Sequence, residues 1–172
     1  MMKKTNPGNI VLDPVMISKS GDNLLRRDCV DVLRSLLIPL ATIVTPNIPE
    51  AEELTGIQVL DKRSMEKAAH YILDMGAQSV IMKGGHMEGD PIDYFFDGEN
   101  SIELVSKRIE TKNTHGTGCT FSSAVAANLA LGKNLEASTR IAQSYVHDSI
   151  DPGFSIGSGH GPLNHFSKFW DM

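Results

Sequence analysis

The sequence predicts an α/β fold in which a mainly parallel sheet carries helices on both faces. Short apolar runs with the length of buried strands alternate with longer segments whose apolar residues recur at helical spacing. Such alternation is typical of βαβ units, which build parallel sheets. Polar residues directly follow the predicted strands, and a glycine turn opens into a predicted helix. We therefore expect a ligand site at the carboxyl ends of the strands.

The first half of the chain contains three predicted strands and three predicted helices. The strands are expected at residues 9–13, 41–45 and 79–83. Two helices are expected at 28–37, where Pro39 ends the run, and at about 64–75, where Gly76 closes it. A short third helix is expected between Asn47, a good N-cap, and Gly56.

The second half begins with a predicted hairpin and ends in two predicted helices. The hairpin strands, 94–96 and 102–105, flank the turn residues 97–100. The glycine turn at 113–118 opens into a helix that has Cys119 on its first turn and continues through an Ala/Ser-rich run at 121–131. The last helix is expected at about 135–150, before a tail rich in Gly, His, Pro and Ser.

Composition excludes several classes of protein. The 172 residues are 41% hydrophobic and 22% charged, which is typical of one globular domain covering residues 1–172. A net charge of -5 without a long basic run argues against a nucleic-acid partner. The apolar runs are too short for a membrane span. Two distant cysteines indicate neither a disulfide framework nor a zinc site, so a cytoplasmic location is expected.

The glycine turn predicts a phosphate site. Gly116 and Gly118 leave backbone N–H groups uncovered at the start of a helix, where the helix dipole favours an anion. Cys119 follows at once, in a position that stabilises a thiolate, so it is a candidate base. The structural alternative is an ordinary glycine turn beside a small buried cysteine.

Polar residues at the strand ends predict the rest of a phosphoryl-transfer site. Asp13 and Glu50 are candidates for holding Mg2+ through water, and Lys83 is a candidate phosphate contact. Each has a structural alternative. Asp13 can cap a turn, Glu50 can complement the dipole of its own helix, and Lys83 can be solvated. The tail histidines lack a supporting ligand set, so no metal is expected there.

Five motifs occur in an order that resembles a known family. They are residues 13–16, residues 45–47 with Glu50, residues 83–86, residues 113–120 and residues 159–165. Together they closely resemble the hydroxymethylpyrimidine phosphate kinases of thiamine biosynthesis, within the ribokinase-like superfamily, from about Asn9 to Phe166. Cysteine at position 119, where most of the superfamily has aspartate, is typical of this branch and of its pyridoxine-phosphorylating relatives.

The resemblance implies a role for each matching position. Cys119 stands at the position of the catalytic base, and Gly116, Thr117 and Gly118 form the anion hole. The nucleotide phosphates are expected near Asn47, Glu50, Lys83, Thr114 and His115. Val15 and Cys119 are expected to contact the pyrimidine. Asp13 and Glu50 are expected near Mg2+.

The resemblance also implies the reaction, an ATP-dependent phosphorylation of hydroxymethylpyrimidine or its phosphate that uses Mg2+. Two alternatives stay open: a pyridoxine or pyridoxal kinase, and a non-catalytic nucleotide-binding remnant. A Cys–His hydrolase is disfavoured because nothing places a histidine and a carboxylate beside Cys119.

The family normally begins with further βα units, so the chain is expected to be truncated at its N-terminus and to correspond to the C-terminal, nucleotide-binding part. We expect it to be a poor kinase alone and, through its open sheet edge, a homodimer.

Overall fold

The computed structural model describes residues 7–16, 24–85, 89–150 and 158–169. The chain divides into two compact units, Met1–Val105 and Ser106–Met172, and each is described by itself. His86 of the predicted Lys-Gly-Gly-His motif lies outside the described residues. No helix in the described ranges has both the length and the apolar character needed to cross a membrane.

The first unit is built on a five-stranded mixed sheet, with strand order β1-β2-β3-β4-β5. The strands are β1 (Val11–Leu12), β2 (Ile43–Val44), β3 (Val80–Met82), β4 (Ile92–Phe96) and β5 (Ser101–Val105). The pairs β1–β2 and β2–β3 are parallel, whereas β3–β4 and β4–β5 are antiparallel.

The α/β class is therefore confirmed, but the prediction of a mainly parallel sheet needs correction. A parallel pairing requires a long crossover connection, usually a helix. Helices separate β1, β2 and β3 in the chain, whereas a short turn joins β4 to β5 and no described helix separates β3 from β4.

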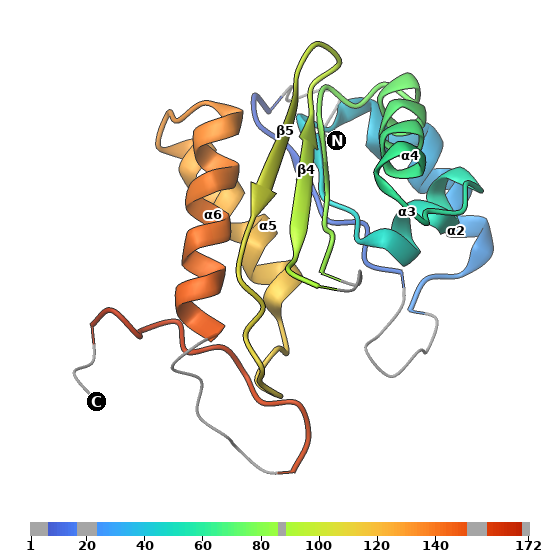
Figure 1. Cartoon of the computed structure of the whole chain (residues 1–172). Coiled ribbons are helices and arrows are strands. Elements are labelled where there is room, and N and C mark those ends of the chain that lie inside the picture. Colours follow the sequence, from blue (N-terminus) through green and yellow to red (C-terminus); the bar gives the residue numbers. More distant parts are fainter. Residues whose placement is uncertain (1–6, 17–23, 86–88, 151–157, 170–172) are drawn as a thin grey trace. The chain divides into compact units, whose positions relative to one another are not determined.

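Among the described residues of this unit, helices lie between the strands of the sheet in the order of the chain (Figure 1). The helix α2 (Arg27–Val32) continues as a π-helical turn η1 (Leu33–Leu37) and a 3₁₀ turn η2 (Ile38–Leu40) that contains Pro39. The helix α3 (Ile48–Thr55) begins and ends at the predicted residues: Asn47 and Glu50 form a capping box, and Gly56 closes the helix with a φ of 70°. The helix α4 (Lys62–Asp74) begins before the predicted Ser64, because Asp61 and Ser64 form a second capping box.

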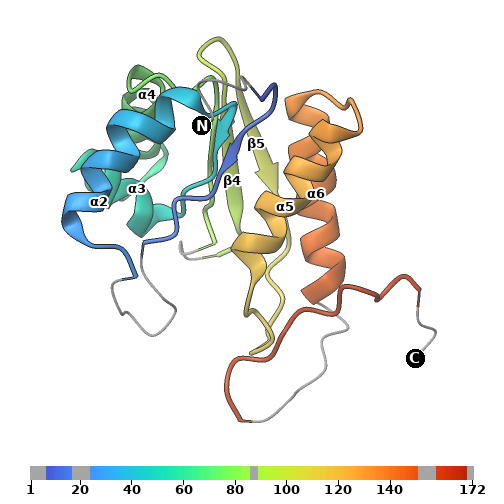
Figure 2. The ribbon, with the colours of Figure 1, turned by 180° about the vertical axis from the view of Figure 1, so that it is seen from behind.

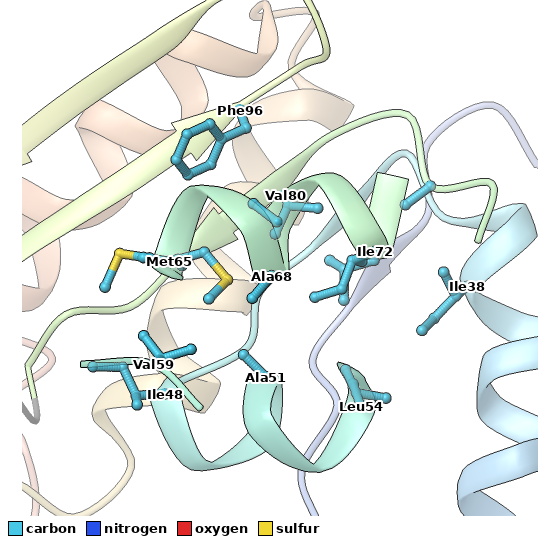
Figure 3. Close-up of a cluster of buried hydrophobic side chains, with 14 of the residues drawn as sticks. Ile38, Ile48, Ala51, Leu54, Val59, Met65, Ala68, Ile72, Val80 and Phe96 are labelled. Carbon is cyan, nitrogen blue, oxygen red and sulfur yellow. The ribbon is translucent and has the colours of Figure 1, made fainter. Parts of the chain in front are cut away.

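The core of this unit lies between the sheet and these helices. Figure 3 shows Val80 and Phe96 of the sheet facing Met65, Ala68 and Ile72 of α4. Alternate strand residues point to the other face of the sheet, because successive side chains of a strand alternate. Ile43, Ile81, Phe95 and Leu104 are also buried. Buried side chains thus lie on both faces of the sheet, although Val105 of the edge strand β5 is 62% exposed.

The second unit contains α5 (Thr117–Ala130) and α6 (Leu135–Ile150), which lie side by side in both views (Figures 1 and 2). The bounds of α6 match the prediction. The helix α5 begins at Thr117, and Gly116 is its N-cap with a φ of 88°, so the prediction that Cys119 stands on the first turn of this helix is confirmed. Thr117, Gly118 and Cys119 therefore form the first turn of the helix.

Candidate active site

Within the described part of the chain, the first turn of α5 presents three backbone N–H groups that have no hydrogen-bond acceptor. In an α-helix the first N–H groups have no partner in the preceding turn. The first bond of this helix joins the Thr120 N–H to the Gly116 carbonyl, at 2.9 Å. No described group accepts a hydrogen bond from the N–H of Thr117, Gly118 or Cys119. Since Gly116 has no side chain to cap them, these donors remain available to an anion.

The loop before this turn is held by its own backbone and by the C-terminal tail. The Thr117 hydroxyl donates to the Thr114 carbonyl, at 3.3 Å, and the His115 N–H donates to the Gly161 carbonyl, at 3.0 Å. Thr114 is half-buried, whereas the His115 side chain is exposed. The loop thus enters α5 along a defined path.

Cys119 is a free and exposed cysteine. It contributes to an open pocket of about 560 Å³ between α5 and α6 within the second unit. Hydroxyl, amide and imidazole groups line this pocket beside the thiol, from Thr120, Ser123, Asn128, Tyr145 and His165. The Cys119 thiol is therefore accessible, which disagrees with the alternative of a small buried cysteine. Its role as the base stays a prediction.

Asp13, Thr45 and Lys83 form a hydrogen-bonded cluster at the strand ends of the first unit. One oxygen of Asp13, Oδ1, accepts from Lys83 Nζ and from the Thr45 hydroxyl, both at 3.1 Å. The Asp13 and Lys83 side chains are each only 15% exposed, and Thr45 is fully buried. Lys83 is therefore not a solvated surface lysine, and Asp13 is more than a turn cap.

Thr45 was missed as a functional candidate, although it lies within one of the quoted motifs. Its position at the end of β2, directly before Pro46, is the signal that could have identified it.

Glu50 lies beside this cluster and is only 3% exposed. Its carboxylate accepts the Asn47 N–H at 2.8 Å, and the Asn47 amide oxygen accepts the Glu50 N–H at 2.9 Å. Burial raises the pKa of Glu50; the Asn47 N–H and the charge of Lys83 oppose the shift, and the charge of Asp13 adds to it. The two carboxylates thus repel each other across a partly dry space.

The turn after β3 holds Lys83 in place. The Lys83 N–H donates to the Pro46 carbonyl, and the backbones of Asn47 and Lys83 pair as a parallel bridge. The Gly84 N–H donates to the Asp93 carboxylate at 2.8 Å, and a Cβ on Gly84 would overlap the Ile92 carbonyl. Asp93 is a second positioning residue that sequence reasoning missed, since nothing in its local sequence marks it.

The two carboxylates are suited to Mg2+. No group of three or more His, Cys, Asp or Glu side chains that could hold a metal occurs within the described residues. Mg2+ does not need such a cage, since it retains several waters and is bound by one or two carboxylates together with substrate phosphates. Asp13 and Glu50 fit this ligand set, with Lys83 as the cation that now neutralises Asp13.

The predicted site residues thus fall into two groups. The first unit brings together Asp13, Asn47, Glu50 and Lys83, with Val15 40% exposed two residues beyond Asp13. The second unit contains the remaining predicted residues, Thr114, His115, Gly116, Thr117, Gly118 and Cys119.

Comparison with known sequences gives consistent matches. The family model for phosphomethylpyrimidine kinase matches residues 1–164. A bifunctional thiamine biosynthesis protein of Geobacter sulfurreducens is 50% identical over 164 residues, which cover 95% of this chain and 34% of that protein. The hydroxymethylpyrimidine/phosphomethylpyrimidine kinase of Bacillus subtilis is 44% identical, over 92% of this chain and 59% of that kinase. The chain spans less than two thirds of the length of both relatives.

Solved structures show the same similarity. The ADP complex of Bacillus subtilis pyridoxal kinase superposes with a TM-score of 0.89 at 36% identity, covering 97% of this chain and 64% of that one. A phosphomethylpyrimidine kinase from Clostridium difficile gives 0.74 at 42% identity, covering 87% and 60%. These neighbours confirm the ribokinase-like fold. With the family model matching nearly the whole sequence, the chain belongs to the phosphomethylpyrimidine kinase family.

Proposed function

We propose that this chain is the nucleotide-binding part of an ATP-dependent kinase that phosphorylates hydroxymethylpyrimidine or its phosphate in thiamine biosynthesis. The observation that carries the proposal is the first turn of α5, where three unpaired N–H groups lie directly beside an accessible thiol. Family membership and the 42% identity to a solved phosphomethylpyrimidine kinase support it.

In the proposed reaction the acceptor hydroxyl attacks the terminal phosphorus of ATP. Cys119, acting as a thiolate, takes the hydroxyl proton and becomes a thiol. A new O–P bond forms, and the bond to the bridging oxygen breaks to release ADP. The N–H groups of Thr117, Gly118 and Cys119 are proposed to bind the β-phosphate that ATP and ADP share and to stabilise the negative charge of the phosphoryl group in transfer.

Residues of the first unit are proposed to bind the nucleotide phosphates. Lys83 supplies a positive charge, while Asn47 shapes the turn beside it. Asp13 and Glu50 would hold Mg2+, which neutralises phosphate charge when it is bound. Thr114 and His115 would border the phosphates from the loop before α5, and Val15 would contact the pyrimidine.

Nucleotide binding tests this proposal directly. We expect Mg-ADP to raise the melting temperature of the chain, because a ligand that binds only the native state stabilises it. Gly118→Val should abolish the shift, since a branched side chain blocks close approach to the N–H groups. Gly159→Val is the matched control, because no atom lies within 4 Å of a Cβ at that exposed position. Absence of both a thermal shift and a calorimetric heat in the wild-type chain would reject the proposal.

A pyridoxal kinase activity is the second candidate. The structural neighbours that favour it are pyridoxal kinases, which superpose with TM-scores of 0.87 to 0.89 at 33–36% identity. Values of kcat/KM for hydroxymethylpyrimidine, its phosphate, pyridoxine and pyridoxal separate the two candidates. Nucleotide binding without turnover of any of these substrates would favour the non-catalytic alternative.

We also propose that the protein is a cytoplasmic homodimer. The base must remain a free thiol, and both cysteines are unpaired. Val32 and Leu36, one helical turn apart on α2 and η1, are 50% and 51% exposed, which is an apolar surface suited to self-association. Sedimentation velocity tests the dimer: Leu36→Lys should release monomers, whereas Leu60→Lys, at an exposed site between α3 and α4, should not.

A further inference from the structure

The C-terminal tail contains a motif, residues 159–165, to which the proposed reaction gives no role. Part of it lies along the loop that precedes α5. The Gly161 carbonyl accepts the His115 N–H at 3.0 Å, and the backbones of His115 and Pro162 pair as a parallel bridge. We call residues 161–164 the strap. The strap therefore contacts His115, which directly precedes Gly116, the N-cap of α5.

The strap is anchored to α6. The Asn164 N–H donates to the Ser149 carbonyl at 2.8 Å, near the end of that helix. Leu163 and Asn164 are 3% and 2% exposed. Tyr145 adds a contact just beyond the strap, because its hydroxyl donates to the His165 carbonyl at 3.2 Å. The strap therefore ties the start of α5 to the end of α6.

The contact between strap and loop leaves no room at Gly161. A Cβ built on Gly161 would overlap the side-chain oxygen of Asn113 and come within 2.8 Å of its Cγ. The next nearest atom is Asn113 Cβ at 3.5 Å, an ordinary contact distance. Both residues are buried, so neither can easily move aside. Among the described residues, the end of the Asn113 side chain is what forces glycine at position 161.

We propose that Gly161 and Asn113 are positioning residues for the anion hole. Their close packing sets the path of residues 113–116 and so the position of the three N–H groups of α5. A displacement of about 1 Å in a site of this kind can cost on the order of 10²-fold in rate, so a small shift of the loop matters. The inference rests on the proposed function for the identity of the ligand, Mg-ADP.

A pair of compensating substitutions tests this inference. Gly161→Ala should weaken Mg-ADP binding by about tenfold or more, because the new methyl group pushes the loop away from the strap. Asn113→Ala removes the overlapping atoms, so that the nearest remaining atom is Asn113 Cβ at 3.5 Å, an ordinary contact distance. The double variant should therefore bind Mg-ADP within about threefold of Asn113→Ala alone. Gly159→Ala, on the same tail with open space around it, is the matched control and should bind as wild type.

Amide hydrogen exchange gives a readout that does not need the nucleotide. The His115 N–H donates to the Gly161 carbonyl and the Thr120 N–H to the Gly116 carbonyl, so both amides report on the loop. Gly161→Ala should accelerate their exchange, and adding Asn113→Ala should reverse this effect in the double variant. If wild type does not bind Mg-ADP, the proposed function fails, and exchange alone decides whether the strap positions the loop.

Three results would overturn the inference. Gly161→Ala could keep the wild-type affinity and amide exchange, or it could melt at a lower temperature without any change in affinity or in the exchange of these two amides. The third is a double variant whose Mg-ADP affinity stays below that of Asn113→Ala alone. Should Gly161→Ala fail to fold, comparison of the double variant with Asn113→Ala still decides the matter.

Discussion

The Glu50 carboxylate serves α3 and the candidate site at the same time. It accepts the Asn47 N–H in the capping box, yet it lies buried near Asp13. Burial of a carboxylate favours its protonated form, and the neighbouring carboxylate adds to that effect. Mg2+ would need the ionised form of Glu50, and keeping this carboxylate ionised where it is buried lowers the stability of the folded state.

The raised pKa of Glu50 predicts a pH-dependent effect of Glu50→Gln. Between the ordinary value of 4.5 and the raised folded pKa, the native state holds more protons than the unfolded state, so the stability of the wild type falls as pH rises through this interval. Glutamine keeps a cap acceptor but does not titrate. We therefore compare the unfolding free energy of Glu50→Gln with that of the wild type. The difference should shift in favour of the variant as pH rises above about 4.5, and it should become constant above the folded pKa of Glu50.

Urea unfolding of the two proteins at several pH values measures this difference. A difference that is flat across the range would show that Glu50 does not titrate abnormally. At neutral pH the same variant should bind Mg-ADP more weakly, because one carboxylate of the proposed metal site is lost.

Cys119 should separate catalysis from binding. As a general base it is worth roughly 10²- to 10⁴-fold in kcat, so Cys119→Ala should lower turnover by that factor and leave the affinity for Mg-ADP nearly unchanged. Iodoacetamide should label the exposed Cys119 faster than the half-buried Cys29. Cys29→Ala is the control for both measurements. Unchanged turnover in Cys119→Ala, in any preparation that turns over substrate, would remove this residue from the mechanism.

At the scale of elements, α3 connects stability to the site. Its capping box joins Asn47 to Glu50, and its first residues follow the end of β2, where Thr45 contacts Asp13. The same local pattern that starts the helix thus orients the candidate phosphate ligands.

Substitution at Asn47 should distinguish these two roles. Asn47→Ala removes the cap acceptor and should lower the unfolding free energy by about 1 kcal/mol. Asn47→Asp keeps an acceptor for the Glu50 N–H and should retain most of that stability, but it adds a negative charge beside Glu50. Thermal unfolding measures the first effect and Mg-ADP calorimetry the second. Equal loss of stability in both variants would contradict the capping role.

At the scale of the whole molecule, the two compact units can unfold together or separately, and the predicted single domain requires that they unfold together. If residues 1–172 form one cooperative domain, a cavity in the core of the first unit should destabilise both units. Ile72 is fully buried against Val80 and Ala68, so Ile72→Ala should cost about 2–5 kcal/mol, whereas Ile72→Val should cost about 0.5–1.5 kcal/mol.

Native-state hydrogen exchange measures the spread of this effect. We expect the most protected amides of α5 and α6 to lose the same free energy as those of α4. Loss confined to the first unit would show that the two units unfold separately, and the single-domain prediction would then be wrong.

Local patterns were sufficient for most elements and for the choice of candidate residues. The cap at Asn47, the hairpin at residues 97–100 and the glycine turn at Gly116 depend on interactions between residues near one another in the chain, so the sequence by itself determined them. The same holds for the order of the five motifs that indicated the family.

Only the tertiary structure decided which distant groups meet. Thr45 reaches Asp13 across 32 positions and Lys83 reaches it across 70. The places of these residues at strand ends indicate a shared edge of the sheet, but not which of their atoms meet. The antiparallel pairing of β3 with β4, the burial that raises the pKa of Glu50 and the overlap that reserves position 161 for glycine likewise depend on how segments outside the local pattern pack together. Periodicity and turn chemistry describe a residue's neighbours in the chain, whereas burial and side-chain partners depend on how the whole fold closes around it.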